Sequence, residues 1–336
     1  MAIIGIQTGK SNTEDAQEKG VYPLFDRSQV IKRSNKYLFD GEYVIVAGEG
    51  NFKPKYYNGK FDLHQRAYCL KSMNTEVINN KYLYYLVLKN YQIFSDYSVG
   101  STVPSLRLSS FSWIEKTIFP SVQEQQKIID IIEPVEKMIN SLNSSKERVI
   151  SLISKIGELS ILLAKKSSSI KFEKQKEKYI ESGNYVSTGN IGDFNNVIEK
   201  VEELTSTPTR ARLQFKKDIL YISKLDGEKK ILYLNKSQDL ILSNGMWGIE
   251  GDKNSKYSLY AFLMSDTFYE EKKMKSTGTT MRGLNDKTLN RIIDSYSISM
   301  IYNVLLCKLF LLLSESAFLL EKLIQIKNNS ISLLIN

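Results

Sequence analysis

The sequence is poor in the side chains that most enzymes use for chemistry. Its 336 residues contain one histidine, His64, and two cysteines, Cys69 and Cys307. The cysteines lie far apart and without metal-ligand spacing, so we expect no zinc site. A single histidine leaves little material for general-base catalysis or for a Cys/His nucleophile pair.

Motifs of nucleotide-binding enzymes and methyltransferases are also missing. Residues 5–11 (GIQTGKS) have three residues between the glycines, whereas a phosphate-binding loop has four. The sequence contains no Asn-Pro-Pro-Tyr or Asp-Pro-Pro-Tyr run. The acidic residues Glu199, Glu202 and Glu203 do not form a nuclease arrangement with a following lysine. We therefore expect no catalytic residue, no metal and no cofactor in this chain.

No signal peptide or transit sequence opens the chain, so the expected location is the cytoplasm. Residues 301–320 are apolar enough to suggest a membrane span, but they include Asn303, Lys308 and Glu315. Ionised groups at mid-bilayer cost roughly 2.5–3.5 kcal/mol each. We therefore predict no membrane contact and a helix that is buried on several sides.

The charge balance points to a polyanionic partner. The chain has 46 Lys and Arg against 37 Asp and Glu, which gives a net charge of +9 and a pI near 9.1. Such a balance favours nucleic acid as the first candidate. The length is sufficient for two ordinary domains, and 42% hydrophobic residues is typical of a globular protein.

The strongest periodic pattern covers residues 121–165. Ser121 and Glu124 match a capping box, so we predict that a helix begins at Ser121. Because Pro134 lacks an amide proton, we expect a kink or break there, with a short helix to about Ile132 and a long one to about Lys165. Apolar residues recur at alternating intervals of three and four, which is typical of a coiled coil. This predicted row consists of Ile128, Ile131, Val135, Met138, Leu142, Val149, Leu152, Ile156, Leu159 and Leu163.

The chain is expected to become helical again from about Met300 to its end. One helix cannot bury a single apolar row alone, so we predict that the two helices pair. The second predicted row consists of Leu305, Leu309, Leu312, Leu319, Leu323 and Ile326.

Short strand-like runs on both sides of the first helix predict two α+β globules. An offset of 178 residues places Gly100 on Gly278, Leu106 on Leu284 and Ile114 on Ile292. We therefore expect the two halves to share a fold and to differ in their loops. The predicted division is a first globule at 1–120, a helical spacer at 121–166, a linker at 167–178, a second globule at 179–297 and a terminal helix at 298–336.

Loops rich in Lys, Arg and Tyr are the candidate nucleic-acid contacts. Their ammonium and guanidinium groups suit phosphates, and bidentate donors suit base edges. The alternatives are that the lysines are simply solvated, that Tyr56 or Tyr57 belongs to the core, and that His64 is a hydrogen-bonding loop residue. The first set is Lys53, Lys55, Tyr56, Tyr57, Lys60, His64, Gln65 and Arg66.

Glycine-led loops in both halves form the second set of candidates. Hydroxyl side chains with backbone amides can clamp phosphates, although an ordinary turn before the next helix explains these loops equally well. The residues of these loops are Ser101, Thr102 and Arg107 in the first half and Thr279, Thr280 and Arg282 in the second. A separate basic candidate in the second half is the run 207–212 (TPTRAR), which contains Thr209, Arg210 and Arg212, and Asn244 is a further candidate.

This order of segments resembles the specificity subunit of type I restriction-modification systems. The first half carries the resemblance at residues 8–16 (TGKSNTEDA), 20–29 (GVYPLFDRSQ), 56–68 (YYNGKFDLHQRAY), 100–107 (GSTVPSLR) and 118–129 (IFPSVQEQQKII). The second half echoes it at residues 185–191 (YVSTGNI), 244–248 (NGMWG) and 276–285 (STGTTMRGLN).

The resemblance implies an α+β protein with two similar target-recognition domains separated by a long antiparallel two-helix coiled coil. Each domain would read one half of a split, asymmetric target in double-stranded DNA. The helices would seat two methyltransferase subunits, with restriction or translocase subunits as further partners. S-adenosylmethionine, ATP and Mg²⁺ would then belong to the partner subunits. The chain itself would be non-catalytic.

The length of the predicted spacer fits such a role. About 28 helical residues between Val135 and Leu163 would span roughly 42 Å, and one turn of B-DNA is roughly 34–36 Å. The alternatives are a coiled-coil scaffold that reads no sequence, the specificity subunit of a related type II methyltransferase-nuclease system, and a stand-alone methyltransferase or nuclease.

Overall fold

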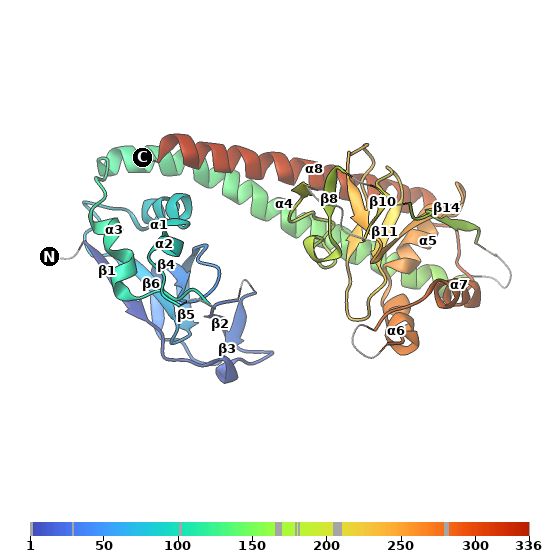
Figure 1. Cartoon of the computed structure of the whole chain (residues 1–336), viewed down its shortest axis with the longest axis horizontal. Helices are drawn as coiled ribbons and strands as arrows, with labels where there is room; N and C mark the ends of the chain where they lie inside the picture. The colour runs from blue at the N-terminus through green and yellow to red at the C-terminus, as the bar shows by residue number, and fades with distance from the viewer. Residues whose placement is uncertain are drawn as a thin grey trace. The chain divides into compact units, whose positions relative to one another are not determined.

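A computed structural model describes residues 3–28, 30–100, 103–164, 170–178, 180, 182–203, 210–278 and 282–335. The chain divides into two compact units, and each long helix contributes to both. The first unit comprises Met1–Lys137 and Ile324–Asn336, and the second comprises Met138–Leu323. Both units mix helices and strands, so the predicted α+β class is confirmed (Figure 1).

The first unit is built on a six-stranded sheet in the order β1-β6-β4-β5-β2-β3. Side chains of alternating residues enter different cores, as the pleat requires. Val44 and Val46 pack with the helices, whereas Ile45 packs with Phe61 on the opposite face. The strands are β1 (Ile4–Thr8), β2 (Tyr22–Phe25), β3 (Lys32–Ser34), β4 (Phe39–Ala47), β5 (Lys55–Leu63) and β6 (Ala67–Ser72).

Short helices cover one face of this sheet. The longest is α1 (Asn80–Asn90), whose N-cap residue Asn79 accepts a hydrogen bond from the amide of Lys81 at 2.7 Å. Tyr82, Leu83 and Tyr85 are buried on it. The others are α2 (Ile93–Asp96), α3 (Ser112–Glu115) and the 3₁₀ turns η1 (Thr13–Asp15) and η2 (Leu108–Phe111).

The second unit has two four-stranded sheets, in the orders β7-β14-β11-β12 and β10-β13-β8-β9. Its strands are β7 (Phe172–Lys174), β8 (Asn184–Val186), β9 (Glu202–Glu203), β10 (Ala211–Gln214), β11 (Leu220–Ser223), β12 (Ile231–Leu232), β13 (Ile241–Ser243) and β14 (Met246–Gly251). Its shorter helices are η3 (Thr188–Asn190), α5 (Lys256–Leu263), α6 (Asp266–Lys275) and α7 (Asp286–Ser295).

One strand of the second unit corrects the predicted division. Strand β7 lies inside residues 167–178, which were expected to be a linker. Its backbone pairs with β14 in antiparallel register, and Phe172 packs against the core of the second unit. The polar composition concealed the strand because its backbone pairing does not depend on apolar side chains.

The pairing of the strands confirms the internal duplication. The order β1-β6-β4-β5 in the first unit recurs as β7-β14-β11-β12 in the second, with every neighbouring pair antiparallel. Strand β2 runs parallel to β5, as β8 does to β13. Isolated bridges agree as well, because Val99 pairs with Ser105 and Thr277 pairs with Gly283.

The first long helix, α4 (Val122–Leu162), begins where predicted. The Ser121 amide donates to Glu124 Oε2 at 2.9 Å, and the Glu124 amide donates to Ser121 Oγ at 3.3 Å. The predicted break at Pro134 is wrong, because α4 is a single helix with this proline inside it. The loss of one backbone hydrogen bond is outweighed by contacts on both sides, where Ile132 is buried and Glu136 forms ion pairs. Leu163 lies just beyond the helix.

The buried row of α4 lies one residue after the predicted row. Among the predicted residues Ile156 is buried, whereas Ile131, Met138, Leu152, Leu159 and Leu163 are exposed and the other four are half-buried. The prediction of helix pairing through the exposed residues is therefore wrong. The row that is actually buried or half-buried consists of Gln125, Ile129, Ile132, Glu136, Ile139, Asn143, Lys146, Ile150, Ile153, Gly157 and Ser160.

The second long helix, α8 (Asn303–Leu334), shows the same displacement. Leu309 and Leu323 of its predicted row are buried, but Leu305, Leu312, Leu319 and Ile326 are exposed. The helix therefore buries one face within the chain, which corrects the expectation of burial on several sides. Its buried or half-buried row consists of Leu306, Phe310, Leu313, Ala317, Leu320, Lys327 and Ile331.

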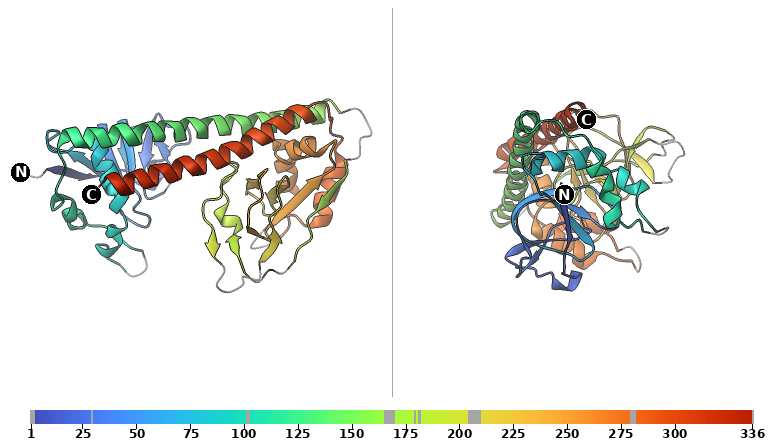
Figure 2. Two further views of the ribbon diagram at one scale, coloured as in Figure 1. Left: turned by 90° about the horizontal axis from the view of Figure 1, so that it is seen from above. Right: turned by 90° about the vertical axis from the view of Figure 1, so that its left-hand side faces the viewer.

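The helices run antiparallel in both units (Figure 2). In the first unit, Ile129 and Ile132 of α4 share a core with Ile331 near the end of α8. In the second unit, Ile150 and Ile153 of α4 share a core with Phe310 near the beginning of α8. The expected antiparallel pair is therefore present.

A nearly buried carboxylate joins three helices of the first unit. Glu136 of α4 lies 2.5 Å from Lys327 of α8 and 2.8 Å from Lys81 of α1, and it accepts a hydrogen bond from the Tyr85 hydroxyl at 2.9 Å. Burial alone raises the pKa of Glu136, but Lys327 and Lys81 outweigh it and hold that pKa below its usual value. The charge is fully compensated, as a buried ion requires.

Replacing Glu136 is expected to destabilise the first unit. Glu136→Gln leaves two nearly buried ammonium groups without a counter-charge, and the free energy of unfolding should fall by about 3 kcal/mol. The change can be measured by urea unfolding in a Trp247→Phe background, in which Trp113 of the first unit is the remaining tryptophan. The matched control is Glu133→Gln, which breaks an exposed pair with Lys137 and should cost less than about 0.5 kcal/mol. Equal effects of the two variants would contradict the role of Glu136.

Candidate nucleic-acid interface

Three of the candidate residues belong to the framework of the first unit. Lys55 donates to the Ser28 carbonyl at 2.6 Å, and burial lowers the pKa of its ammonium. Tyr56 packs on Tyr84, whereas Tyr57 packs on Phe25 and Phe61. Adjacent residues of β5 point to opposite faces, so the two tyrosines enter two different cores. Tyr56 and Tyr57 therefore pack in cores, as the alternative to DNA contact predicts.

Lys53 and Lys60 extend from the same region and are exposed. The Lys60 ammonium lies 4.7 Å from the centre of the Tyr37 ring, and this tyrosine raises the pKa of Lys60. Lys60 therefore stays charged at neutral pH, and both lysines are accessible, as a phosphate contact requires.

His64, Gln65 and Arg66 lie together at the turn between β5 and β6, on the wall of a polar pocket of about 310 Å³. Burial lowers the pKa of His64. Its Nδ1 accepts a hydrogen bond from the Arg66 amide at 3.0 Å, which supports the interpretation as a hydrogen-bonding loop residue. Gln65 Nε2 donates to Asn12 Oδ1 at 2.6 Å.

An acidic residue of the same pocket holds two arginines. Arg66 Nη1 donates to Glu49 Oε1 at 2.7 Å, and Arg27 Nη1 lies 3.6 Å from Glu49 Oε2. Glu49 is nearly buried, whereas both guanidinium groups are largely exposed. The pocket therefore presents two exposed guanidinium groups that Glu49 holds in place, and Glu14 and Asp26 add two further carboxylates to its lining.

In the second unit, the backbone brings two of the candidates together. The Asn244 amide donates to the Arg210 carbonyl at 2.8 Å, and Arg210 is exposed at the start of β10. Arg212 and Asn244 are half-buried. Trp247 is buried in the core, and its Nε1 donates to Asp286 at 2.8 Å. Trp247 therefore has a packing role.

The glycine-led loops occupy equivalent places in the two units. Gly100 and Gly278 have φ angles of +102° and +125°, which favour glycine. Arg107 is exposed beside the first loop, and Arg282 lies 3.8 Å from Asp226 beside the second. Ser101, Thr102, Thr209, Thr279 and Thr280 lie outside the described residues.

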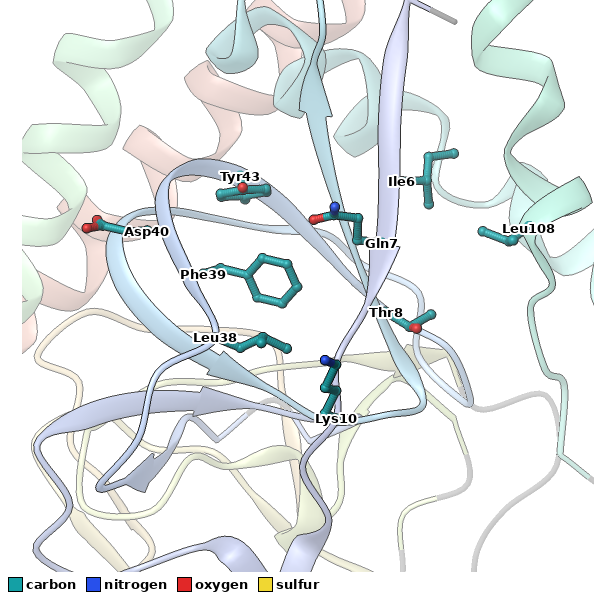
Figure 3. Close-up of a pocket in the computed structure, with 9 residues that line it drawn as sticks. All are labelled: Ile6, Gln7, Thr8, Lys10, Leu38, Phe39, Asp40, Tyr43 and Leu108. Carbon is teal, nitrogen blue, oxygen red and sulfur yellow. The ribbon is translucent and has the colours of Figure 1, made fainter.

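A second hollow of the first unit has a volume of about 590 Å³ and lies between β1 and the start of β4 (Figure 3). Gln7, Thr8 and Lys10 line it from one side, and Phe39 and Tyr43 line it from the other. Its lining mixes the Lys10 ammonium and the Asp40 carboxylate with amide, hydroxyl and aromatic groups, which can bind a ligand.

The part of the chain that the structure describes contains no group of three or more His, Cys, Asp or Glu side chains able to hold a metal ion. Helix α8 is long and apolar enough to cross a membrane by length and composition alone. Its Leu306, Phe310 and Leu313 are nevertheless packed into the core of the second unit.

Residues 3–152 match the family model of the type I restriction modification DNA specificity domain. These residues form a specificity domain of that family. The resemblance inferred from the sequence is therefore confirmed for this part of the chain. This specificity domain contains the whole pocket around His64 and Glu49.

Individual relatives agree with the assignment of the specificity domain. The chain is 27% identical over 162 residues, 48% of its length, to the type I restriction enzyme EcoDI specificity subunit of Escherichia coli. It is 29% identical over 132 residues, 38% of its length, to a protein of Mycoplasma pneumoniae assigned as a type I specificity subunit. The matched stretches span 36% and 42% of the length of those two relatives.

A solved structure supports the fold of the whole chain. The type I restriction-modification S subunit of M. genitalium matches with a TM-score of 0.55 and 16% identity, covering 99% of this chain and 94% of that one. The fold is therefore shared beyond the specificity domain itself.

Sequence patterns did not reveal Asn12, Arg27 and Glu49 of the specificity domain, nor Asp226 of the second unit. Each of these residues lies beside its partner because the strand order brings distant parts of the chain together. No regular spacing in the sequence links the residues to their partners. The one available signal was the offset of 176–178 residues, which brings Glu49 into register with Leu225, the residue before Asp226.

A buried lysine supports the corresponding turn of the second unit. Lys272 donates to the carbonyls of Ser223 at 2.8 Å and Glu228 at 2.9 Å, so it holds both ends of the segment that contains Asp226. Burial lowers the pKa of Lys272 to about 8 against the attraction of nearby carboxylates. In the specificity domain the equivalent position, at an offset of 178, is the buried Phe94.

The buried lysine predicts a pH dependence of stability. Between pH 8 and 10.5 the unfolded state binds the Lys272 proton and the folded state does not, so the free energy of unfolding rises with pH in this window. From pH 8 to pH 10.5, the free energy of unfolding of the wild type should rise by on the order of 2–3 kcal/mol more than that of Lys272→Met. Urea unfolding followed by Trp247 fluorescence at several pH values measures the difference. A difference that stays flat from pH 7 to 10.5 would contradict the pKa.

Proposed function

We propose that this chain is the DNA-recognition subunit of a type I restriction-modification complex. It reads a bipartite, asymmetric target in double-stranded DNA and performs no chemistry by itself. The observation that carries the proposal is the duplicated α+β unit, whose first copy is a specificity domain. Two copies of one fold with different loops suit a target with two different halves.

The two recognition domains are proposed to be residues 1–120 and 179–297, the second together with strand β7 (Phe172–Lys174), and residues 121–166 and 298–336 are proposed as the helical part. In each domain the exposed cations are the proposed DNA contacts. Lys53, Lys60 and Arg66 serve the first half-site, and Arg210 and Arg282 serve the second. The net charge of +9 supports binding to phosphates.

The exposed rows of the helices are the proposed seat of the methyltransferase subunits. In the second unit these rows consist of Met138, Leu152 and Leu159 on α4 and of Leu305, Leu312 and Leu319 on α8. Each row lies one residue before the buried row of its helix. A side chain one residue earlier in a helix is rotated about the helix axis by about 100°. Because the two helices run antiparallel, the earlier residues of both helices face the same side of the pair. The six side chains therefore form one apolar surface, of the kind that subunit interfaces use.

The proposed binding to DNA agrees with a cytoplasmic location, which we propose for this chain. Two methyltransferase subunits, with S-adenosylmethionine as their cofactor, are the proposed partners, and restriction subunits with ATP and Mg²⁺ are further ones. The specificity subunit of a related type II methyltransferase-nuclease system is the alternative for the complex. A scaffold that reads no sequence is the alternative for the chain.

Selection of bound duplexes from a random pool tests DNA reading directly. The full chain with its methyltransferase partner should enrich one sequence with two specific parts and an unspecific gap. Competition at physiological salt should favour this sequence over unrelated duplexes by roughly 10³-fold or more. Equal binding to every duplex would rule out the proposal and leave the scaffold alternative.

A charge placed in the exposed row should separate partner binding from folding. Leu152→Glu inserts a carboxylate into the proposed apolar interface, so the affinity for the methyltransferase subunit should fall about tenfold or more. Because Leu152 is exposed in the chain alone, the melting temperature should hardly change. The matched control is Ser151→Glu, one residue away and also exposed. If both variants bind the methyltransferase like the wild type, this surface is not its seat.

A further inference from the structure

The same arrangement of charges occurs at one turn in each unit. Glu49 follows β4 and is 15% exposed, while its partners Arg66 and Arg27 are 65% and 72% exposed. Asp226 follows β11 and is 18% exposed, while its partner Arg282 is 52% exposed. In both cases a nearly buried carboxylate pairs with a guanidinium group that faces solvent. Glu49 accepts a hydrogen bond from Arg66 at 2.7 Å, whereas Asp226 lies 3.8 Å from Arg282 Nε, and Arg282 Nη2 donates to the carbonyls of Ser276 at 3.2 Å and Lys273 at 3.4 Å.

The two turns are equivalent in their backbone contacts. Leu106 donates to the Gly48 carbonyl at 2.8 Å, and Leu284 donates to the Lys224 carbonyl at 3.0 Å. One residue pair further out, Gly50 donates to Pro104 at 3.1 Å and Asp226 donates to Arg282 at 2.8 Å. The arginine, however, comes from the β5–β6 turn in the first unit and from the glycine-led loop in the second. An arginine held by an acid thus recurs although different segments supply it.

Holding an arginine in this way is unfavourable for a simple phosphate contact. The carboxylate cancels one positive charge and so weakens the attraction to the DNA backbone. It does fix the plane of the guanidinium, and a fixed plane matters when two parallel hydrogen bonds must form. In the major groove, guanine offers such a pair of acceptors, O6 and N7, and arginine is their commonest partner.

The surroundings of Glu49 support recognition of a base edge. Arg27 and Arg66 share the pocket of about 310 Å³ with Gln65 and Asn12. The hydrogen bond from Gln65 to Asn12 fixes both amides, so Gln65 Oε1 and Asn12 Nδ2 retain defined directions. Amide groups with fixed directions are the usual readers of adenine and its neighbours.

We propose that Glu49 and Asp226 are positioning residues, which orient Arg66 and Arg282 to bind the O6 and N7 atoms of one guanine in each half-site. Arg27 assists from the second oxygen of Glu49. The inference rests on the proposed function, because it assigns the base chemistry by which this chain reads DNA.

Substitution of guanine by 7-deazaguanine tests the contact, since this base lacks the N7 acceptor. In the duplex selected by the wild-type complex, each guanine is replaced in turn and the dissociation constant is measured. One replacement in each half-site should weaken binding roughly 10- to 100-fold. Arg66→Ala should abolish the sensitivity in one half-site, and Arg282→Ala should abolish it in the other.

The positioning role is tested with Glu49→Gln, which keeps the size of the side chain and removes its charge. Discrimination between guanine and 7-deazaguanine should fall about tenfold in the first half-site, with the second half-site unchanged. Binding to unrelated duplexes at low salt should stay equal or become slightly tighter. Asp226→Asn should do the same for the second half-site. The matched control is Glu42→Gln, which removes the same charge from β4 outside the pocket.

Three results would overturn the inference. In the first, no guanine of the selected duplex is sensitive to the loss of N7. In the second, Arg66→Ala lowers affinity equally for all duplexes and reduces the salt slope by about one, which marks a phosphate contact. In the third, Glu49→Gln leaves discrimination unchanged. All three leave the proposed function standing, whereas a wild-type complex without any sequence preference would remove both.

Discussion

The constraint on which this structure depends is that neither long helix can bury its inner row alone. Each unit solves it by packing a sheet with short helices against α4 and α8 together, so that the helix pair is part of both cores. In the first unit, the polar centre of that packing is Glu136 with Lys81 and Lys327. An ion pair at this position fixes the register of the helices, because a shift would leave buried charges unpaired.

The sequence predicted the helices, the duplication and the fold class, but not the face that each helix buries. Helix α4 carries two neighbouring apolar rows, with Ile128 beside Ile129 and Leu152 beside Ile153. The row that is actually buried contains Glu136 and Lys146, so a search for apolar periodicity prefers its neighbour. Glu136 can be buried because its charge is paired with Lys81 and Lys327, and Lys146 can be buried because the stem of a lysine side chain is aliphatic. Those contacts are long-range and cannot be read from spacing.

The candidate site was predicted at the level of loops rather than of residues. The turn at His64, Gln65 and Arg66 and the glycine-led loops do lie at the surface of their units. Tyr56 and Tyr57 lie in cores, because adjacent residues of a strand alternate between faces. The acids that hold the arginines escaped notice, since Glu49 and Asp226 have ordinary local surroundings and acquire their partners from the strand order. The two acids become recognisable as partners of arginines only when the equivalent turns of the two units are compared.

The account treats the chain as two recognition modules of one fold, and an exchange of modules tests this most directly. Residues 3–120 are replaced by the corresponding residues of a related specificity subunit, and the sequence bound by the complex is determined again. The account predicts that one half of the target changes while the other half and the gap persist. A change in both halves, or in neither, would contradict it.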